Sequence, residues 1–308
     1  MPNALPNLPM QMMMSMTSWL SSPSGFPPSN AGFPLWNPTA SANQLNPAEQ
    51  AKLSQAIANE AKNRAEGFLK GLLRYTETPY RRTLKEPPAI WRKGNARLLD
   101  YSERDADGPV VIFLPSLINR YYILDLDEER SLLRHAASTG ACTLVLDWGA
   151  PGKSEIDFSC ADYVSDVLLQ AIEFVQRSTG KKVTLAGYCM GGVMALAATI
   201  LKPQLINSIA LFATPWNFHC KSFSPYIFSE NWHPTIDAML SKKETLAADT
   251  IQSLFYWTDP WVFENKYRRF AEMEDDKEID EFVALEQWVN DGVPMTAPAA
   301  RECLIGWA

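Results

Sequence analysis

Apolar residues recur every three or four positions in the first regular segment of the chain, at Leu53, Ile57, Ala61, Ala65, Phe68 or Leu69, and Leu72. This spacing places them on one face of an amphipathic helix. Asn46 can cap the helix, Pro47 fits its first turn, and Glu49 can reach back to the cap. Pro79 is expected to end it.

A different pattern begins near residue 85. Residues 89–101 predict a hairpin that turns at Gly94 and Asn95. Short apolar runs follow at 109–115, 142–148, 182–187 and 206–215. Helical segments separate them, at about 126–138, 160–178 and 190–201. Buried strands that alternate with crossover helices predict an α/β fold with a mostly parallel sheet.

These patterns divide the chain into four segments. Residues 1–45 are rich in Met, Pro, Ser and Asn and predict a disordered tail. Residues 46–80 form the helical segment, and 81–215 form the α/β core. Residues 216–308 are helical and aromatic and predict a cap inserted after the fourth parallel strand. The chain ends in LIGWA without a helix-stop signal, so we expect the core to be incomplete.

Composition narrows the functional classes. A net charge of −7 and a pI near 5.1 disfavour a nucleic-acid-binding protein. Five scattered cysteines without a CxxC pair suit a reducing cytoplasm. No charged residue precedes Glu49, so a basic signal-peptide region is missing. No apolar run reaches the 18 to 20 residues of a membrane span, and we expect a cytoplasmic protein without one.

The stretch LAGYCMGG, residues 185–192, has the G-x-S-x-G spacing of a nucleophile elbow, with Cys189 in the serine position. It lies between a predicted strand and a predicted helix, as the motif requires. Gly187 and Gly191 permit the tight turn, and Gly192 lets the helix lie near the sheet. The helix N-terminus behind Cys189 favours a thiolate. Cys189 is therefore the candidate nucleophile.

An elbow also needs backbone donors for a developing oxyanion. The loop within FLPSLINRYYILDL, residues 113–126, follows an earlier strand and offers the N–H groups of Leu117 or Ile118. Together with the N–H of Met190, these are the candidates. An ordinary strand-to-helix connection explains the loop equally well.

A base for the thiol is not evident. Only His219 and His233 follow Cys189. The motif orders the nucleophile, then the acid, then the histidine on later strands, and we expect no strand after residue 215. A structural or substrate-contacting His219 is favoured over a relocated base.

Several separated motifs resemble the polyhydroxyalkanoate (poly-3-hydroxybutyrate) synthases, namely GYCMGG, PSLINRYYILDL, LVLDWGAPG (144–152), ATPWNFH (213–219) and FVALEQWVNDGVPMTAPAAREC (282–303). The resemblance implies an α/β-hydrolase-fold acyltransferase that polymerises 3-hydroxyacyl-CoA. It implies that Cys189 is acylated and that Met190 and Ile118 supply oxyanion donors. The family's aspartate and histidine are expected beyond Ala308.

The resemblance also implies the partners. The substrate is a coenzyme A thioester, no metal or cofactor is expected, and the product is a growing polyester chain at a granule surface. A homodimer or a second synthase subunit fits this picture. A thiol suits the chemistry, because exchange between thioester and thiol is nearly even and the acyl-cysteine stays reactive.

Two other functions remain open. One is a cysteine-nucleophile hydrolase of the same fold, either a thioesterase or an intracellular polyester depolymerase. The other is a non-catalytic remnant or interaction protein.

Overall fold

The computed structural model describes residues 46–104, 106–218, 233–256 and 260–307. The tail expected at 1–45 and His219 lie outside these residues. Contacts divide the chain into two compact units: Met1–Tyr80 with Gln252–Val283, called here the helical unit, and Arg81–Ile251 with Ala284–Ala308, called the sheet unit. The segment expected as one cap, 216–308, is thus shared between the two units.

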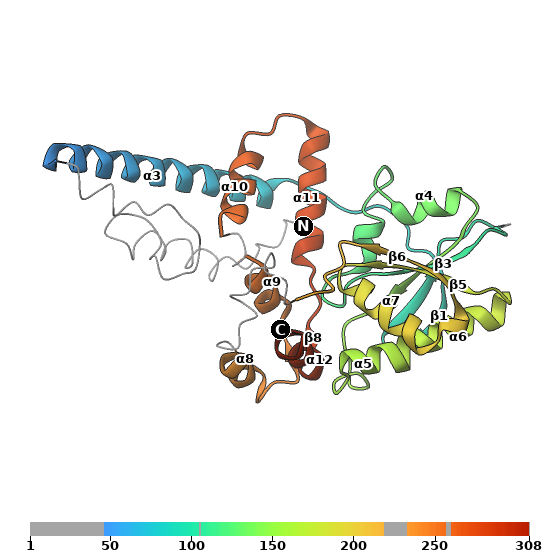
Figure 1. Cartoon of the computed structure of the whole chain (residues 1–308). Helices are drawn as coiled ribbons and strands as arrows, with labels where there is room; N and C mark the ends of the chain where they lie inside the picture. The colour runs from blue at the N-terminus through green and yellow to red at the C-terminus, as the bar shows by residue number, and fades with distance from the viewer. Residues whose placement is uncertain (1–45, 105, 219–232, 257–259, 308) are drawn as a thin grey trace. The chain divides into compact units, whose positions relative to one another are not determined.

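The helical unit is built on α3 (Pro47–Glu77), which is blue in Figure 1. Its start matches the expected cap. The Asn46 Oδ1 accepts from the N–H groups of Ala48 and Glu49, both at 3.0 Å, and the Glu49 carboxylate accepts from the Asn46 N–H at 2.9 Å. This reciprocal capping satisfies donors that a helix N-terminus otherwise leaves unpaired.

Helix α10 (Pro260–Ala271) packs closely on α3. A Cβ at Gly71 would lie 1.9 Å from the Tyr267 carbonyl oxygen, so only glycine allows this approach. Arg74 donates to the Phe270 carbonyl at 2.9 Å near the end of α10. The side chains buried in this core are Phe68, Leu72, Tyr75, Phe263, Tyr267, Phe270, Ile279 and Val283. The apolar stripe of α3 is therefore buried only towards its end, and Leu53 is 42% exposed.

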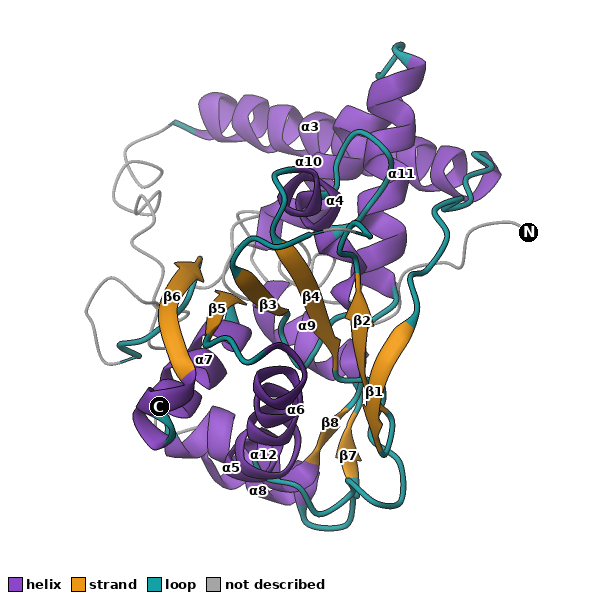
Figure 2. Ribbon diagram, turned by 90° about the vertical axis from the view of Figure 1, so that its right-hand side faces the viewer, coloured by secondary structure: helices purple, strands orange, loops and turns teal. Residues whose placement is uncertain are grey.

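The sheet unit contains a six-stranded sheet in the order β1-β2-β4-β3-β5-β6, which Figure 2 shows from one edge strand to the other. The strands are β1 (Ala89–Lys93), β2 (Ala96–Asp100), β3 (Val110–Leu114), β4 (Cys142–Asp147), β5 (Val183–Tyr188) and β6 (Ile206–Phe212). Strands β4, β3, β5 and β6 pair in parallel, and β1 and β2 form the predicted hairpin. The predicted mostly parallel α/β sheet is confirmed.

Successive side chains of the strands face opposite sides of the sheet. Ile112 and Leu114 belong to one buried cluster, whereas Phe113 between them belongs to another. Helices α5 (Cys160–Asp162), α6 (Leu169–Thr179) and α7 (Met190–Leu201), with the π-helix η3 (Tyr163–Leu168), contribute to the first cluster. The 3₁₀-helix η2 (Tyr121–Leu124) and α4 (Leu132–Ser138) contribute to the second. Helices thus cover both faces, as the buried strands required.

Two predicted helices need correction. The segment predicted as helix from 126 to 138 becomes helical only at Leu132, because Ser131 caps it and accepts from the Arg134 N–H at 3.0 Å. The segment 160–178 is helical but contains the π-helix η3. Apolar spacing alone does not reveal such a local change in helical pitch.

Asp125 anchors the end of the loop after β3. Its carboxylate is completely buried and accepts from Arg82 at 2.6 Å, Arg134 at 2.8 Å, Tyr101 at 2.8 Å and Ser131 at 2.6 Å. Burial raises the pKa of Tyr101 far above its ordinary value, which keeps its hydroxyl a donor. The buried carboxylate is thus paired with two guanidinium groups and bonded by two hydroxyls. Such pairing and hydrogen bonding offset the cost of burying a charge.

The expectation that no strand follows residue 215 is wrong. Strands β7 (Thr245–Leu246) and β8 (Met295–Thr296) form a small antiparallel sheet. Each has two residues, which is too short to show alternation in the sequence. The other helical elements of the sheet unit are η4 (Pro203–Leu205), α8 (His233–Leu240), α12 (Ala297–Arg301) and the π-helix η6 (Glu302–Gly306).

Helices α9 (Ala248–Tyr256) and α11 (Asp276–Asn290) each begin in one unit and end in the other. Within the described ranges, no helix has both the length and the apolar character needed to cross a lipid bilayer.

Candidate active site

Cys189 lies at the sharp turn between β5 and α7. Its backbone has φ 52° and ψ −125°, a left-handed conformation that is uncommon for a residue with a side chain. The turn is held at both ends: the Cys189 N–H donates to the Phe212 carbonyl at 2.8 Å, and the Gly192 N–H donates to the Cys189 carbonyl at 2.9 Å. This is the geometry of a nucleophile elbow.

Glycines let neighbouring segments close on this turn. A Cβ at Gly191 would lie 2.0 Å from the Leu114 carbonyl oxygen, and one at Gly192 would lie 1.9 Å from the Thr214 Oγ1. A Cβ at Gly187 would lie 2.4 Å from the Gly192 Cα. The start of α7 therefore touches the end of β3 and the turn after β6, both at the carboxyl edge of the sheet where ligands bind in open α/β folds.

The Cys189 thiol is half-buried, and two effects on its pKa oppose each other. Burial raises the pKa, and a hydrogen bond from the backbone N–H of Met190 lowers it; burial prevails. The thiolate preference expected from the helix N-terminus is thus outweighed. Within the described ranges, no imidazole or carboxylate is hydrogen-bonded to Cys189, and the raised pKa favours the protonated thiol.

The candidate oxyanion donors approach the elbow from two sides. Met190 is the buried first residue of α7. The loop after β3 begins beside it, since the same Cβ at Gly191 would lie 2.6 Å from the Pro115 carbonyl oxygen. In that loop Leu117 is buried, and among the described residues the Ile118 N–H reaches only the Ser116 hydroxyl, at 3.5 Å. A bond of that length is weak and leaves the Ile118 N–H able to serve another acceptor.

Three donors from distant parts of the sequence fix this loop. The indole of Trp148 donates to the Pro115 carbonyl at 2.9 Å. The Val293 N–H donates to the Ile118 carbonyl at 2.9 Å, and the indole of Trp288 donates to the Arg120 carbonyl at 2.8 Å. Three carbonyls of the loop, those of Pro115, Ile118 and Arg120, therefore each accept a hydrogen bond from a distant part of the chain.

Sequence reasoning missed these three donors. Trp148 follows β4, and Trp288 and Val293 lie near the end of the chain. These residues lie in motifs that the sequence analysis identified. A sequence motif, however, does not predict which carbonyl a side chain or backbone N–H in it will bond. A tryptophan next to a glycine-rich turn is the sequence signal that could have indicated such a bond, because a buried indole N–H usually finds a hydrogen-bond acceptor.

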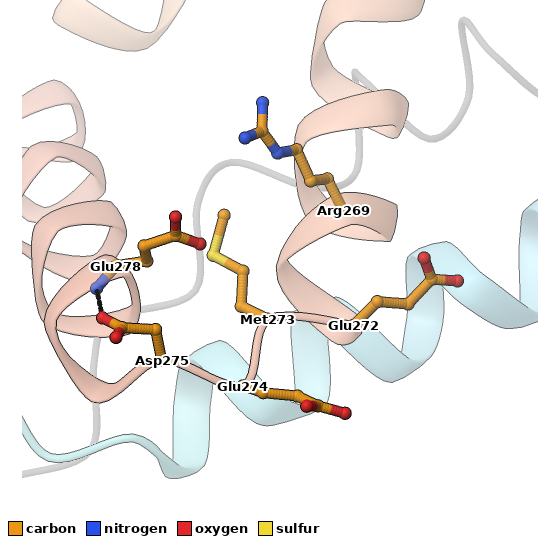
Figure 3. Close-up of a pocket in the computed structure, with 6 residues that line it drawn as sticks. All are labelled: Arg269, Glu272, Met273, Glu274, Asp275 and Glu278. Carbon is orange, nitrogen blue, oxygen red and sulfur yellow. Dashed lines mark hydrogen bonds between the residues drawn. The ribbon is translucent and has the colours of Figure 1, made fainter.

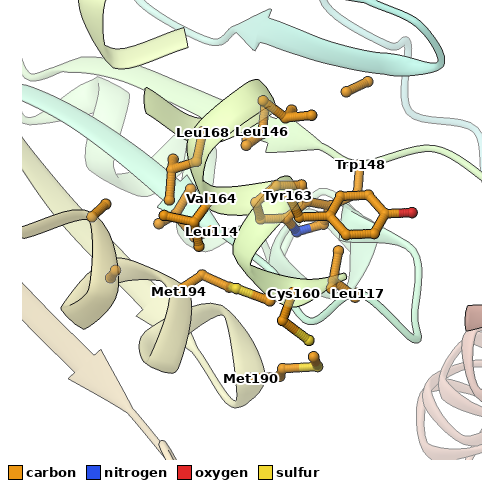
Figure 4. Close-up of a cluster of buried hydrophobic side chains, with 14 of the residues drawn as sticks. Leu114, Leu117, Leu146, Trp148, Cys160, Tyr163, Val164, Leu168, Met190 and Met194 are labelled. Atoms are coloured by element: carbon orange, nitrogen blue, oxygen red, sulfur yellow. The ribbon is translucent and has the colours of Figure 1, made fainter. Parts of the chain in front are cut away.

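The side chains around the elbow form one continuous cluster, shown in Figure 4. Trp148 packs edge-on against Tyr163, with ring centroids 6.0 Å apart. Leu117 and Met190 belong to the same cluster. The loop and the first turn of α7 thus share a common apolar support.

The histidines after Cys189 do not complete a triad in the described structure. His233 begins α8, and its Nε2 is buried with no hydrogen-bond partner in the described part of the chain. His219 lies outside the described residues.

The helical unit has a shallow depression where α10 leads into α11 (Figure 3). Its lining residues are Arg269, Glu272, Met273, Glu274, Asp275 and Glu278. With four carboxylates and one guanidinium, it does not suit an anionic group such as a coenzyme A phosphate.

Comparison with known proteins shows which family the chain belongs to. The family model described as the alpha/beta hydrolase fold matches residues 109–280. The poly(3-hydroxyalkanoate) polymerase subunit PhaC of Haloarcula marismortui is 32% identical over 64% of this chain and 42% of its own length. The subunit of the same name from Haloferax mediterranei is 27% identical over 70% of this chain and 45% of its own length.

The chain thus spans about half the length of the curated relatives it matches. Among solved structures, a carboxylesterase of Nitrososphaera gargenis is 13% identical over 70% of each chain, with a TM-score of 0.40. The elbow at Cys189, the layered sheet and the matched model lead to one conclusion: this chain belongs to the alpha/beta hydrolase fold family, and it is related in sequence to poly(3-hydroxyalkanoate) polymerase subunits.

Proposed function

We propose that this chain carries the nucleophile of an acyltransferase that polymerises 3-hydroxyacyl-CoA, with Cys189 as the residue that takes the acyl group. The observation that carries the proposal is the strained turn at Cys189, which presents a thiol between β5 and the N-terminus of α7. The names of the sequence relatives supply the substrate class.

The proposed first step is an exchange of thioesters. The Cys189 sulfur attacks the thioester carbonyl, the carbon–sulfur bond to coenzyme A breaks, and coenzyme A leaves as its thiol after taking up the proton released by Cys189. In the second step the hydroxyl of another hydroxyacyl unit attacks the acyl-Cys189. An ester bond forms, the bond between the acyl carbon and the Cys189 sulfur breaks, and the hydroxyl proton passes to the sulfur, which is free for the next round.

Both steps pass through an oxyanion. The N–H of Met190 and the N–H of Ile118 or Leu117 are the proposed donors, because the loop and the helix start meet at Gly191. Burial keeps Cys189 protonated, so the attack needs a base. By resemblance to the synthases, we propose that this base is a histidine oriented by an aspartate.

The setting we propose is the cytoplasm, with the growing polyester held at a granule surface. Neither a metal nor a cofactor takes part in the proposed steps, because the thioester itself is the activated donor.

The test uses the intact gene product with 3-hydroxybutyryl-CoA and measures released coenzyme A by chromatography. Cys189→Ala should lower the release by about 1000-fold or more, because the covalent route is lost. Cys142→Ala, which changes a half-buried thiol on β4, is the matched control and should retain activity. Unchanged release in Cys189→Ala removes this residue from the proposed role.

A hydrolase is the second candidate, since the matched family model describes a hydrolase fold. The products separate the two. Free 3-hydroxybutyrate that accumulates in proportion to coenzyme A identifies a thioesterase, whereas a lengthening oligoester identifies the polymerase.

A further inference from the structure

Two cysteines far apart in the sequence lie in direct contact within the sheet unit. The Sγ atoms of Cys160 and Cys303 are 3.4 Å apart, and either thiol can donate to the other. Cys160 is 3% exposed, whereas Cys303 is half-buried. The proposed acyl transfer uses neither of them.

The backbone around the two sulfurs is fixed on both sides. The Glu302 carboxylate accepts from the Cys160 N–H at 2.9 Å, next to the sulfur contact. On the other side, the Thr296 hydroxyl donates to the Phe158 carbonyl at 2.5 Å. The segment from α12 into η6 is therefore held against the start of α5, and the two thiols stay facing each other.

We propose that Cys160 and Cys303 are a reversible disulfide site, which closes under oxidising conditions and joins η6 to α5. A disulfide has a sulfur–sulfur distance of about 2.0 Å, so the two atoms must approach by about 1.4 Å from their 3.4 Å contact. Side-chain rotation about the Cα–Cβ bonds can supply such a movement with the backbone held in place.

The two thiols have different tasks in this closure. Cys303 is the more exposed sulfur and is the one that meets an oxidant first. The hydrogen bond from Cys303, together with burial, raises the pKa of Cys160 well above its ordinary value, which keeps Cys160 protonated until its partner has reacted.

With hydrogen peroxide as the oxidant, the steps balance. The Cys303 sulfur attacks the peroxide, the O–O bond breaks, and Cys303 becomes a sulfenic acid while one water is released. The Cys160 sulfur then attacks the Cys303 sulfur, and the hydroxyl leaves with the Cys160 proton as a second water. Two thiols are oxidised to one disulfide, and one peroxide is reduced to two waters. A small dithiol such as dithiothreitol reverses the bond by exchange.

The site lies beside the elbow without belonging to it. Cys160 is part of the same buried cluster as Leu117 and Met190 (Figure 4). The disulfide would tie the segment that contains Cys303 covalently to this cluster. The tie closes a long loop, since the two residues are 143 positions apart, and loops of that length gain the most from a cross-link.

The experiment treats the whole chain with a small excess of hydrogen peroxide, alkylates the remaining thiols, and maps the peptides by mass spectrometry without reduction. We expect a linked peptide pair that contains Cys160 and Cys303, a loss of two hydrogen atoms from the intact mass measured before alkylation, and a higher melting temperature of the chain before alkylation. Dithiothreitol should reverse all three changes. The Cys189→Ala chain should behave in the same way, which separates this site from the proposed nucleophile.

The variants define the pair. Cys303→Ser, at the half-buried position, should abolish the linked peptide and the rise in melting temperature, whereas Cys142→Ser should leave both intact. Two results overturn the proposal. In the first, the protein is unfolded after peroxide treatment, and Cys160 and Cys303 can both still be alkylated. Oxidation of Cys142 in the same sample shows that the peroxide was effective. The other is a linked peptide that joins either cysteine to a different partner.

Discussion

At the scale of single residues, Cys189 combines a strained backbone with a protonated thiol. The sequence LAGYCMGG predicts where the turn lies, because the glycine spacing and the flanking strand and helix are local features. It does not predict that burial prevails over the helix N-terminus in setting the thiol pKa. Burial depends on the segments that pack around Cys189, and these come from distant parts of the chain.

The strain at Cys189 gives a prediction at this scale. The left-handed conformation at φ 52° disfavours any residue with a Cβ, so Cys189→Gly should be more stable than Cys189→Ala by about 1 kcal/mol. Elsewhere in a helix or strand the order would be reversed. Urea unfolding of the two variants measures the difference. Equal stability, or a more stable alanine variant, would mean that the turn relaxes and that the elbow is not held in this conformation.

At the scale of elements, the site is a junction of three strand ends whose connecting loop is fixed by side chains. Leu114 of β3 pairs with Gly187 of β5, and Tyr188 of β5 pairs with Phe212 of β6. The alternation of apolar runs and helices predicts this junction, because the carboxyl ends of parallel strands share one edge. The indole bond from Trp148 to the loop is not predictable in this way, since it depends on side-chain direction.

Trp148→Phe tests the hold on the loop. Phenylalanine retains an aromatic ring to pack on Tyr163 but leaves the buried Pro115 carbonyl without its donor, which should destabilise the fold by about 1–3 kcal/mol. In the intact gene product we also expect a fall in kcat with little change in KM, because a loosened loop would hold the proposed oxyanion donors less well, which affects the transition state more than binding.

Trp91→Phe is the matched control for this change, because Trp91 on β1 is half-buried and packs against the same cluster. It should alter kcat little. Equal effects of the two substitutions would show that the indole of Trp148 contributes packing rather than position.

The buried carboxylate of Asp125 gives a second prediction for the elements. Asp125→Ala leaves Arg82 and Arg134 without their shared partner and should destabilise the protein by about 3–5 kcal/mol. Asp127→Ala removes a carboxylate from a half-buried pair with Arg130 three residues away and should have a much smaller effect. Thermal unfolding of the two variants compares them, and similar losses would contradict a special role for the buried cluster.

At the scale of the whole molecule, the fold class follows from the sequence but the division into units does not. The predicted parallel strands appear within a few residues of their expected positions. The segment 216–308 looks uniform because it is helical and aromatic throughout, yet its parts pack into two different cores. Those contacts join residues that are far apart in the chain, so the local periodicity of apolar residues cannot predict them.

The exposed edge strand β6 gives a prediction about association of the whole molecule. In the described part of the chain, β6 pairs only with β5, and Ile209, Leu211 and Phe212 are 37%, 42% and 43% exposed. An apolar edge strand is prone to pair with another chain. Leu211→Lys should therefore lower concentration-dependent association, measured by light scattering, while unfolding free energy changes by no more than about 0.5 kcal/mol.

Leu285→Lys is the control for the edge, because Leu285 on α11 is equally exposed at 42% but lies on a helix. We expect no comparable change in association for this variant. If both substitutions act alike, general hydrophobicity and not the β6 edge governs association.

The most direct test of the central claim is to catch the acyl group on its residue. The intact gene product is mixed with 3-hydroxybutyryl-CoA, quenched in acid within the first turnover, and digested for peptide mass mapping. We predict a hydroxybutyryl group, or a short oligomer of it, on the peptide that contains Cys189 and on that sulfur. An acyl group on another residue, or coenzyme A released with Cys189 never modified, would contradict the account.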